Sequence, residues 1–278
     1  MSMTLYHWNN SVCSQKVRMV LAEKNFTDWE SKIIDIFSGE QWDPEYLKLN
    51  PKGVVPTLLH DGKVVVESTL IAEYLDEILP GPQLMPADPA DRVQMRLYSK
   101  TCDEGLHPAI AVISYAAMFT ARNKKHRSKE EMEEALSNII DLERRDRQTA
   151  VYEQAENAPH VYRGVVAYEK IFQKVGKVLA DGREWLTGDI FSLAEINLAT
   201  YIIRLEYLKI LDVWIDDRPL VNAWWEKVKA RSCFKTAITD WVHEADSAEM
   251  GVNGLRLKPH FASLRETYLT TDKGAQIY

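Results

Sequence analysis

The chain has few cysteines and does not begin as a secreted protein does. It contains three cysteines in 278 residues, and Cys13, Cys102 and Cys233 are far apart and cannot all pair. The N-terminal stretch also lacks the basic-then-apolar pattern of a signal peptide. We therefore expect the protein to reside in the reducing cytoplasm.

Basic residues are not in excess, and long apolar runs are missing. Lysine and arginine number 34 against 41 aspartates and glutamates, which gives a formal net charge of −7. This balance argues against a nucleic-acid partner. The longest apolar stretches, such as 109–118, are about ten residues, whereas a membrane span needs about 20. We expect neither a membrane span nor a metal site.

What the chain does have is the composition of a globular protein with a sizeable core. Apolar residues make up 46% of it and charged residues 27%. A length of 278 residues predicts two domains, or one large domain, at about 150 residues per domain.

The first eighty residues alternate short strand patterns with helical patterns. Asp61-Gly62 is a strong hairpin-turn signal between two of the strands, and Ser68 is placed to cap the helix that follows them. The order is β-α-β, an irregular link, and then β-β-α, which is the order of a thioredoxin-like domain. The predicted strands are 4–8, 32–35, 57–60 and 63–67, and the predicted helices cover 12–24 and 68–79.

Beyond residue 86 the strand patterns fade and long helical patterns replace them. A helix is predicted over 92–119, with a kink at Pro108. Further helices are expected near 144–155, 163–180 and 220–230. The polar, weakly periodic stretch 244–278 is predicted to lie over the surface as a tail or to be partly disordered.

The fold class that follows is α+β: an N-terminal thioredoxin-like domain with a mixed four-stranded sheet, then an all-α C-terminal domain. The predicted limits are 1–82 for the first domain, 88–243 for the second and 244–278 for the tail. Within the helical half, Ser192 and Glu195 have the spacing of a capping box, and Phe191 is placed to pack onto Ile196.

Several of these features together resemble the cytosolic glutathione transferases, over about residues 4–240. They are the thioredoxin-like half, the run 50–56, the pair Glu67-Ser68, and the stretch 186–195 in an all-helical second half. One departure is Glu195, where the family commonly has aspartate; glutamate still completes the capping box. The resemblance implies that glutathione is the cosubstrate.

The resemblance also assigns a glutathione site. Val55-Pro56, directly before a strand, suits a cis peptide bond, and the exposed backbone of Val54 and Val55 is implied to pair with the cysteinyl part of glutathione. Ser68, at a helix start, is implied to hold the γ-glutamyl carboxylate, with Glu67 near the ammonium group. Weaker assignments place Gln41 and Lys52 at the glycyl end.

The catalytic group is expected between the first strand and the first helix. Ser11 matches the active serine of the serine-using branches, whose hydroxyl donates a hydrogen bond to the glutathione sulfur. Two rivals are close by. Cys13 is a nearby thiol, and Ser14 occupies a position that one bacterial branch uses. Tyr6 is interpreted as strand core.

The enlarged helical half and the added tail resemble the bacterial β-etherase branch, whose members use glutathione to cleave aryl ethers of lignin. A homodimer is also implied. The stretch 244–278 is expected to be dispensable for folding and to act as a lid over the electrophile site. Aromatic and apolar side chains are interpreted as lining that site: Trp8, Tyr115, Met118, Phe119, Tyr207 and Trp214.

Two other functions remain open at this stage. The chain can be a glutathione-binding module with little turnover, or a thiol-disulfide reductase that uses Cys13. Ser11, together with Val55-Pro56 and Glu67-Ser68, favours the transferase.

Overall fold

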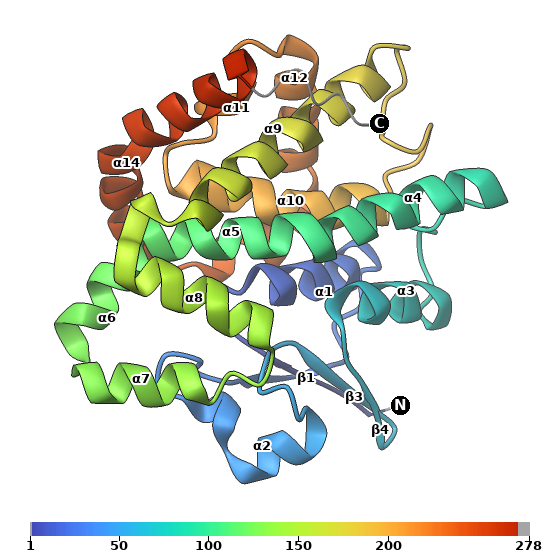
Figure 1. Cartoon of the computed structure of the whole chain (residues 1–278). Coiled ribbons are helices and arrows are strands. Elements are labelled where there is room, and N and C mark those ends of the chain that lie inside the picture. The colour runs from blue at the N-terminus through green and yellow to red at the C-terminus, as the bar shows by residue number, and fades with distance from the viewer. Residues whose placement is uncertain (1, 272–278) are drawn as a thin grey trace. The chain divides into compact units, whose positions relative to one another are not determined.

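A computed structural model describes residues 2–271 of the chain (Figure 1). These residues divide into two compact units. The first contains 2–99, 182–200 and 223–243, and the second contains 100–181, 201–222 and 244–271. Because packing units need not follow chain order, the domain limits drawn from the sequence remain predictions. Within residues 2–271, no helix is long and apolar enough to cross a membrane.

The first unit is built on a four-stranded sheet of order β2-β1-β3-β4. β1 pairs parallel with β2 and antiparallel with β3, and β3 pairs antiparallel with β4. The sheet is therefore mixed, which confirms the predicted thioredoxin-like arrangement. The strands are Met3–His7 (β1), Glu30–Ile33 (β2), Thr57–His60 (β3) and Lys63–Val65 (β4).

Helices α1 (Val12–Glu23) and α3 (Ser68–Ile78) pack together on one face of this sheet, and α2 (Pro44–Leu49) lies on the other side (Figure 1). The predicted hairpin turn is present, with Asp61 and Gly62 both at positive φ. α1 also packs against α13 (Ser232–Ala237), which belongs to the same unit.

A buried ion pair fixes the chain where it leaves α3. Lys24 Nζ lies 2.6 Å from Asp76 Oδ1, and both side chains are almost fully buried. Asp76 also accepts hydrogen bonds from the backbone N–H groups of Leu84 and Met85, each at 2.9 Å. These bonds hold the residues after α3 against the body of the first unit.

The capping interaction predicted at Ser192 and Glu195 forms, with one difference. Glu195 accepts from the Ser192 backbone N–H at 3.0 Å, as in a capping box, but Ser192 Oγ accepts from Ala194 N–H at 3.2 Å. Glu195 further accepts from the Leu186 N–H at 2.6 Å. The carboxylate therefore ties the preceding loop to the start of α10 (Leu193–Tyr207).

The long helix predicted over 92–119 is continuous but changes its winding twice. Two π-helical turns separate regular segments, and Pro108 lies in the first turn of the middle segment, after the first of them. A π-helical turn and the predicted proline, two features that commonly kink helices, therefore lie next to each other in this helix. The segments are α4 (Pro89–Thr101), η2 (Cys102–Leu106), α5 (His107–Ser114), η3 (Tyr115–Phe119) and α6 (Thr120–His126).

The helices that follow α6 agree broadly with the predicted ones. α9 packs on α5, and α8 packs on α5, α7 and α9. The remaining bounds are α7 (Lys129–Ser137), α8 (Leu142–Gln154), α9 (Pro159–Leu179), α11 (Asp212–Ile215) and α12 (Pro219–Lys229).

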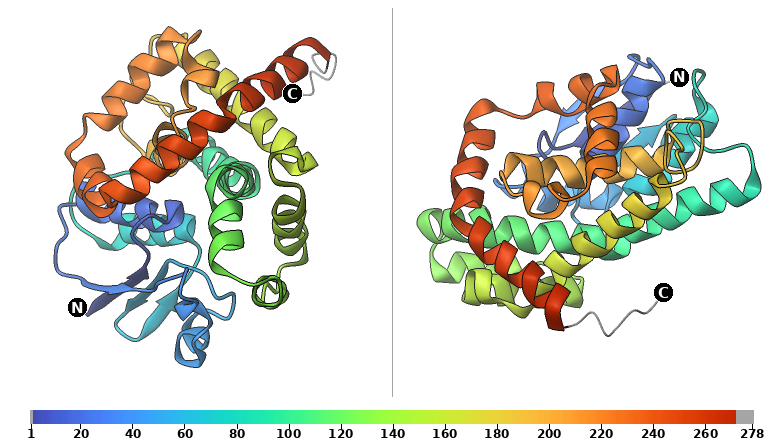
Figure 2. Two further views of the ribbon diagram at one scale, coloured as in Figure 1. Left: turned by 90° about the vertical axis from the view of Figure 1, so that its left-hand side faces the viewer. Right: turned by 90° about the horizontal axis from the view of Figure 1, so that it is seen from above.

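The stretch predicted as a surface tail is a helix of 28 residues, α14 (Glu244–Thr271), drawn as one continuous red ribbon in Figure 2. It packs on α9 and η3 and buries Met250, Leu257 and Phe261. Gly254 passes so close to Leu208 that a Cβ at this position would lie 1.9 Å from the Leu208 carbonyl oxygen. The tail prediction is therefore wrong for these residues; 272–278 lie outside the described residues.

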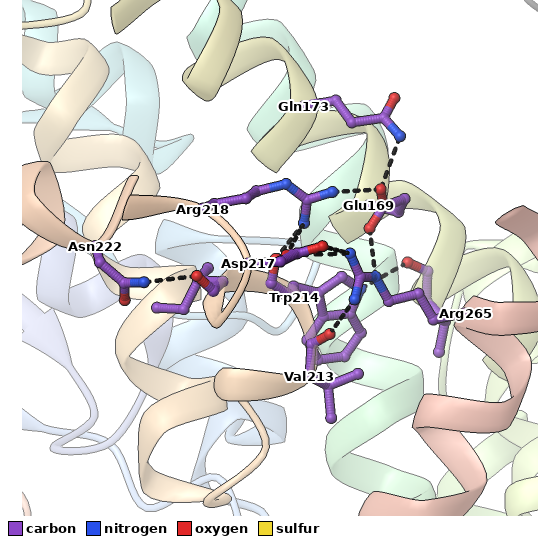
Figure 3. Close-up of polar contacts among 10 residues, drawn as sticks. Glu169, Gln173, Val213, Trp214, Asp217, Arg218, Asn222 and Arg265 are labelled. Carbon is purple, nitrogen blue, oxygen red and sulfur yellow. Dashed lines mark hydrogen bonds and ion pairs between the residues drawn. The ribbon is translucent and has the colours of Figure 1, made fainter. Parts of the chain in front are cut away.

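A buried carboxylate holds α14 in the second unit (Figure 3). Glu169, on α9, is fully buried. It accepts hydrogen bonds from Arg265 Nε of α14 at 2.7 Å, from Arg218 Nη2 at 2.5 Å and from Gln173 Nε2 at 2.7 Å. Arg265 also donates to the Val213 carbonyl oxygen at 2.8 Å. The charge of Glu169 is thus balanced by two arginines from different segments of the chain, Arg265 on α14 and Arg218 just before α12.

Candidate functional site

Ser11 is the N-cap of α1, where its backbone is extended (φ −80°, ψ 121°). Its Oγ accepts a hydrogen bond from the Ser14 backbone N–H at 3.3 Å. Because the oxygen acts here as an acceptor, the hydroxyl proton remains available to a ligand. The side chain is partly exposed at the positive end of the helix, where a thiolate is stabilised.

The two rival groups sit in the first turn of the same helix. Ser14 is fully buried, and its Oγ accepts from the Trp8 backbone N–H at 3.2 Å, so this hydroxyl closes the β1–α1 loop from inside. Cys13 is partly exposed and forms no disulfide with another described cysteine. The geometry favours Ser11 over Ser14 as a donor to a bound sulfur.

Arg18 holds the loop that carries Ser11, a role for which the sequence offered no signal. The side chain is 2% exposed. Its guanidinium donates to the carbonyl oxygens of Asn9 at 2.7 Å, Trp8 at 3.2 Å and Ala237 at 2.8 Å. One side chain on α1 therefore fixes the loop between β1 and α1 and links it to α13.

His7, at the end of β1, completes this arrangement. Its Nδ1 lies 3.0 Å from Arg18 Nη1 and its Nε2 lies 2.8 Å from Ser31 Oγ. Since arginine only donates, Nδ1 must accept, and the ring is neutral with its proton on Nε2. Burial, with a smaller contribution from the Arg18 charge, lowers the pKa of His7 to about 3. Burial also lowers the pKa of Arg18 to about 9.

Two side-chain hydrogen bonds fix the predicted backbone-binding loop at Val54. The Val54 carbonyl oxygen accepts from Tyr46 Oη at 2.7 Å and from Asn50 Nδ2 at 2.9 Å. The Val55–Pro56 peptide bond is cis, as the sequence suggested. Like Arg18, Tyr46 was not identified from the sequence. Asn50, by contrast, is the first residue of the run 50–56 that the sequence analysis names.

The second part of the predicted glutathione site lies at the start of α3. Ser68 is its first residue, and Glu67 before it has a positive φ of 68°, an unusual conformation for glutamate. Lys52 Nζ lies 2.6 Å from Glu67 Oε1, and both side chains are exposed. On η1 (Glu40–Trp42), Gln41 Oε1 is buried and has no hydrogen-bond partner among residues 2–271.

Strand register brings these parts to one end of the sheet. Tyr6 pairs with Thr57, so the end of β1 that leads to Ser11 lies beside the start of β3, directly after Val55-Pro56. Leu58 pairs with Val65, so the end of β4 that leads to Ser68 lies next to the same place. The three segments predicted to bind glutathione, which contain Ser11, Val55 and Ser68, therefore lie at the same end of the sheet.

Some of the residues predicted to line the electrophile pocket are too deeply buried to face an open site. Met118 and Trp214 are core side chains, 3% and 0% exposed, and Trp214 Nε1 donates to the Val165 carbonyl oxygen at 3.2 Å. These two residues do not line an open site, since their positions are filled by packing. Tyr115 and Phe119 are half-buried, with ring centroids 5.3 Å apart.

The other two predicted lining residues are also half-buried. Trp8, in the first unit, has its ring centroid 6.1 Å from that of Phe37. Burial raises the pKa of Tyr207, in the second unit, to about 12, so its phenol is neutral at physiological pH.

Comparisons with known proteins identify the family of the chain. A sequence model of the glutathione S-transferase N-terminal domain matches residues 5–83, and one of the C-terminal domain matches residues 144–226. Protein LigF of Sphingobium sp. (strain NBRC 103272 / SYK-6) is 31% identical over 260 residues, covering 84% of this chain and 97% of LigF. The crystal structure of β-etherase LigF superposes with a TM-score of 0.75 and 28% identity, over 85% of this chain and 98% of that one.

A second relative is named for a different activity. The tetrachloro-p-hydroquinone reductive dehalogenase of Sphingobium chlorophenolicum is 30% identical over 243 residues, covering 84% of this chain and 94% of that protein. The identity extends over almost the full length of both relatives, and both halves of the fold match family models. The chain therefore belongs to the glutathione S-transferase family of enzymes.

Proposed function

We propose that the protein activates glutathione as a thiolate for attack on an aromatic or hydrophobic electrophile, and that its reaction is the cleavage of β-aryl ethers. The observation that carries the activity is Ser11, capping α1 with an available hydroxyl proton at the edge where the glutathione-binding segments gather. The likeness to β-etherase LigF over nearly its whole length supports an aryl ether as substrate.

In this proposal each part of the site holds one part of glutathione. The Val55 backbone pairs with the cysteinyl unit, and Ser68 binds the γ-glutamyl carboxylate at the start of α3. Glu67 takes the ammonium group, and Lys52 with Gln41 holds the glycyl end. The unsatisfied Gln41 Oε1 supports a polar ligand group there.

The chemistry is a displacement at the carbon that bears the ether oxygen. Ser11 Oγ–H donates to the glutathione sulfur, which favours the thiolate over the thiol. The thiolate forms a C–S bond as the C–O bond breaks; the phenolate leaves with the bond electrons and takes a proton from solvent. The products are a glutathione thioether and a phenol, with no oxidant or reductant consumed.

A halogenated aromatic compound is the alternative electrophile. The dehalogenase relative, at 30% identity, is the observation that favours it. The same Ser11-bound thiolate would then displace halide in place of phenolate.

Product analysis separates these activities. The purified protein is incubated with glutathione and, in separate samples, an aryl β-ether, a chlorodinitrobenzene and a mixed disulfide, and the products are identified by mass spectrometry. We expect a glutathione thioether and a free phenol from the ether. Release of thiol from the disulfide alone would support the Cys13 reductase instead, and no product from any compound would support a binding module.

We also infer that the protein is a cytoplasmic homodimer, as the family resemblance implies. None of the cysteines in the described part of the chain forms a disulfide, which supports a reducing compartment. Two-fold pairing is typical of soluble oligomers.

A further inference from the structure

The loop between β1 and α1 is held by residues 237–243, which form the last part of the chain in the first unit. This segment begins at the last residue of α13. The Ala237 carbonyl oxygen accepts from Arg18 Nε at 2.8 Å, and His243 Nε2 lies 3.5 Å from Asn9 Nδ2. Two residues of the segment therefore contact the loop itself or the arginine that fixes it.

A third residue of this segment, Trp241, lies over the face of the same arginine. Trp241 ends the short helix η5 (Thr239–Trp241), and its ring centroid lies 4.7 Å from Arg18 Cζ. This distance is within the range of a cation–π interaction. The hydrogen bonds of a guanidinium lie in its plane, so the ring covers the face that those bonds leave open. Because Arg18 is 2% exposed, water does not weaken this contact.

The indole ring of Trp241 is itself fixed by its other neighbours. Its Nε1 donates to the Thr236 carbonyl oxygen at 3.0 Å. The His7 ring meets it edge-on, with the centroids 5.0 Å apart, and Trp29 stacks on it at a centroid distance of 6.5 Å. These contacts set the orientation of the indole independently of Arg18. The ring is therefore a fixed support against which the guanidinium is held.

The path from Arg18 to Ser11 is short. The Trp8 carbonyl oxygen accepts from Arg18 Nη1 at 3.2 Å and from the Ser11 backbone N–H at 3.3 Å. Arg18 Nη2 donates to the Asn9 carbonyl oxygen at 2.7 Å. A tilt of the guanidinium would move the acceptor of the Ser11 N–H and, with it, the N-cap of α1.

We propose that Trp241 is a positioning residue: its ring holds Arg18 in the orientation that directs the Ser11 hydroxyl at the glutathione sulfur. The proposal rests on the proposed function, because it takes Ser11 to be the donor to that sulfur. Trp241 acts through Arg18 and the Trp8 peptide group and needs no contact with glutathione. Small displacements of a catalytic group are costly, so a residue that acts at this remove can still affect the rate.

The test measures the pKa of the glutathione thiol while glutathione is bound to the full chain. The ultraviolet absorbance of the thiolate is followed as pH is raised. The same titration of the protein without glutathione is subtracted, which removes the contribution of Cys13. Wild type should hold this pKa below that of free glutathione, because a hydrogen bond to the thiolate favours the charged form. A loss of protein stability alone does not shift this pKa, so the measurement separates positioning from folding.

Two variants isolate the face of the ring. Trp241→Leu and Trp241→Phe both lose the N–H bond to Thr236, but only phenylalanine keeps an aromatic face for Arg18. Trp241→Leu should raise the thiol pKa by about one pH unit and lower kcat roughly 10-fold, with little change in the KM for glutathione. Trp241→Phe should stay close to wild type in both measurements.

The outcomes that contradict the proposal are distinct. Equal thiol pKa values in wild type and Trp241→Leu would overturn it, because the ring would then have no effect on Ser11. Equal rises in Trp241→Leu and Trp241→Phe would also overturn it, since the loss would then come from packing or from the N–H bond. Trp241→Met repeats the comparison with a longer, adaptable side chain, in case the leucine variant does not fold.

Failure of this inference can be told apart from failure of the proposed function. The proposed function fails when wild type leaves the thiol pKa of bound glutathione at the value of free glutathione, or forms no thioether from an aryl ether. The inference alone fails when wild type lowers this pKa, Ser11→Ala raises it again, and Trp241→Leu leaves it unchanged.

Discussion

Ser11 performs two tasks at once, because its oxygen caps α1 while its proton is left for a ligand. Ser11→Ala should therefore lower kcat roughly 10²-fold, the usual effect of losing one donor to a developing or stabilised anion. The KM for glutathione should change little, since in the proposed site backbone and charged groups elsewhere hold the tripeptide. Loss of the cap should cost about 1 kcal/mol of stability, visible as a lower Tm.

Two neighbouring variants serve as controls for that prediction. Cys13→Ser should leave thioether formation largely intact. Ser14→Ala removes a buried acceptor for the Trp8 N–H, so its main effect should be on stability. A folded Ser14→Ala protein that loses more turnover than Ser11→Ala would move the donor role to Ser14.

The free energy of unfolding should depend on pH through His7, and the lowered pKa of His7 determines the direction. Its pKa is lowered from 6.5 to about 3 in the folded protein, first by burial and then by the Arg18 charge. Between these values the unfolded chain binds a proton that the folded chain does not, so the stability falls as pH drops below 6.5. The slope from this residue is at most about 1.4 kcal/mol per pH unit.

The His7→Asn variant isolates this contribution, since the amide oxygen can accept from Arg18 as Nδ1 does. Urea unfolding of both proteins at pH 7.5, 6.5 and 5.5 gives the comparison. The difference in unfolding free energy between wild type and variant should shrink or reverse as pH falls. Parallel curves at all three pH values would show that His7 does not titrate in the unfolding equilibrium.

The helix α14 shows that a polar, weakly periodic stretch of sequence can form a well-packed helix. Its buried positions Met250, Leu257 and Phe261 are separated by seven and four residues, a helical spacing, but glycines and Pro259 in the same stretch obscure it. The attachment to Glu169 is also invisible in the sequence, because the carboxylate lies 96 residues from Arg265, on α9. Removal of α14 should thus cost stability, contrary to the expectation from composition.

Arg265→Gln tests that attachment without removing the helix. The variant leaves buried Glu169 with Arg218 and Gln173 alone and should lower the unfolding free energy by about 2 kcal/mol. Arg256→Gln is the matched control, since Arg256 lies on the same helix, half-exposed and 3.9 Å from Glu156. It should cost less than about 0.5 kcal/mol. Equal losses in the two variants, measured by urea unfolding, would deny Glu169 this role.

For the whole molecule, the sequence was informative wherever structure is set locally. Strand periodicity, the Asp61-Gly62 turn and a helix start at Ser68 all predict features that the first unit contains. The predicted cap at Ser68 is wrong, because Ser68 is the first residue of α3 and its N-cap is Glu67, whose side chain makes no capping hydrogen bond. The order β-α-β then β-β-α is enough to choose the mixed sheet. What the sequence did not predict depends on residues brought together only by folding, such as Arg18 with Ala237, or on how a side chain packs, as with Trp214.

The inferred homodimer has a candidate contact surface on the first unit. Leu70 of α3 and Val93 of α4 are 57% and 54% exposed, unusual for large apolar side chains. Each lies three residues before a member of the Glu73–Arg96 ion pair, which joins α3 and α4 at 2.8 Å. Since residues three apart share a helix face, both apolar side chains flank that ion pair on one surface.

A single charge on this surface should separate the subunits. Wild type should sediment at about twice the 32.0 kDa of one chain. Val93→Glu places a carboxylate in the contact and should shift the protein toward the mass of one chain, because an unpaired charge is costly to bury. Val252→Glu makes the same substitution at an exposed valine of α14, in the second unit, and should leave the dimer intact. A wild-type mass of 32.0 kDa at micromolar concentration would reject the dimer, and a Val93→Glu protein that stays at twice that mass would place the subunit contact on another face of the molecule.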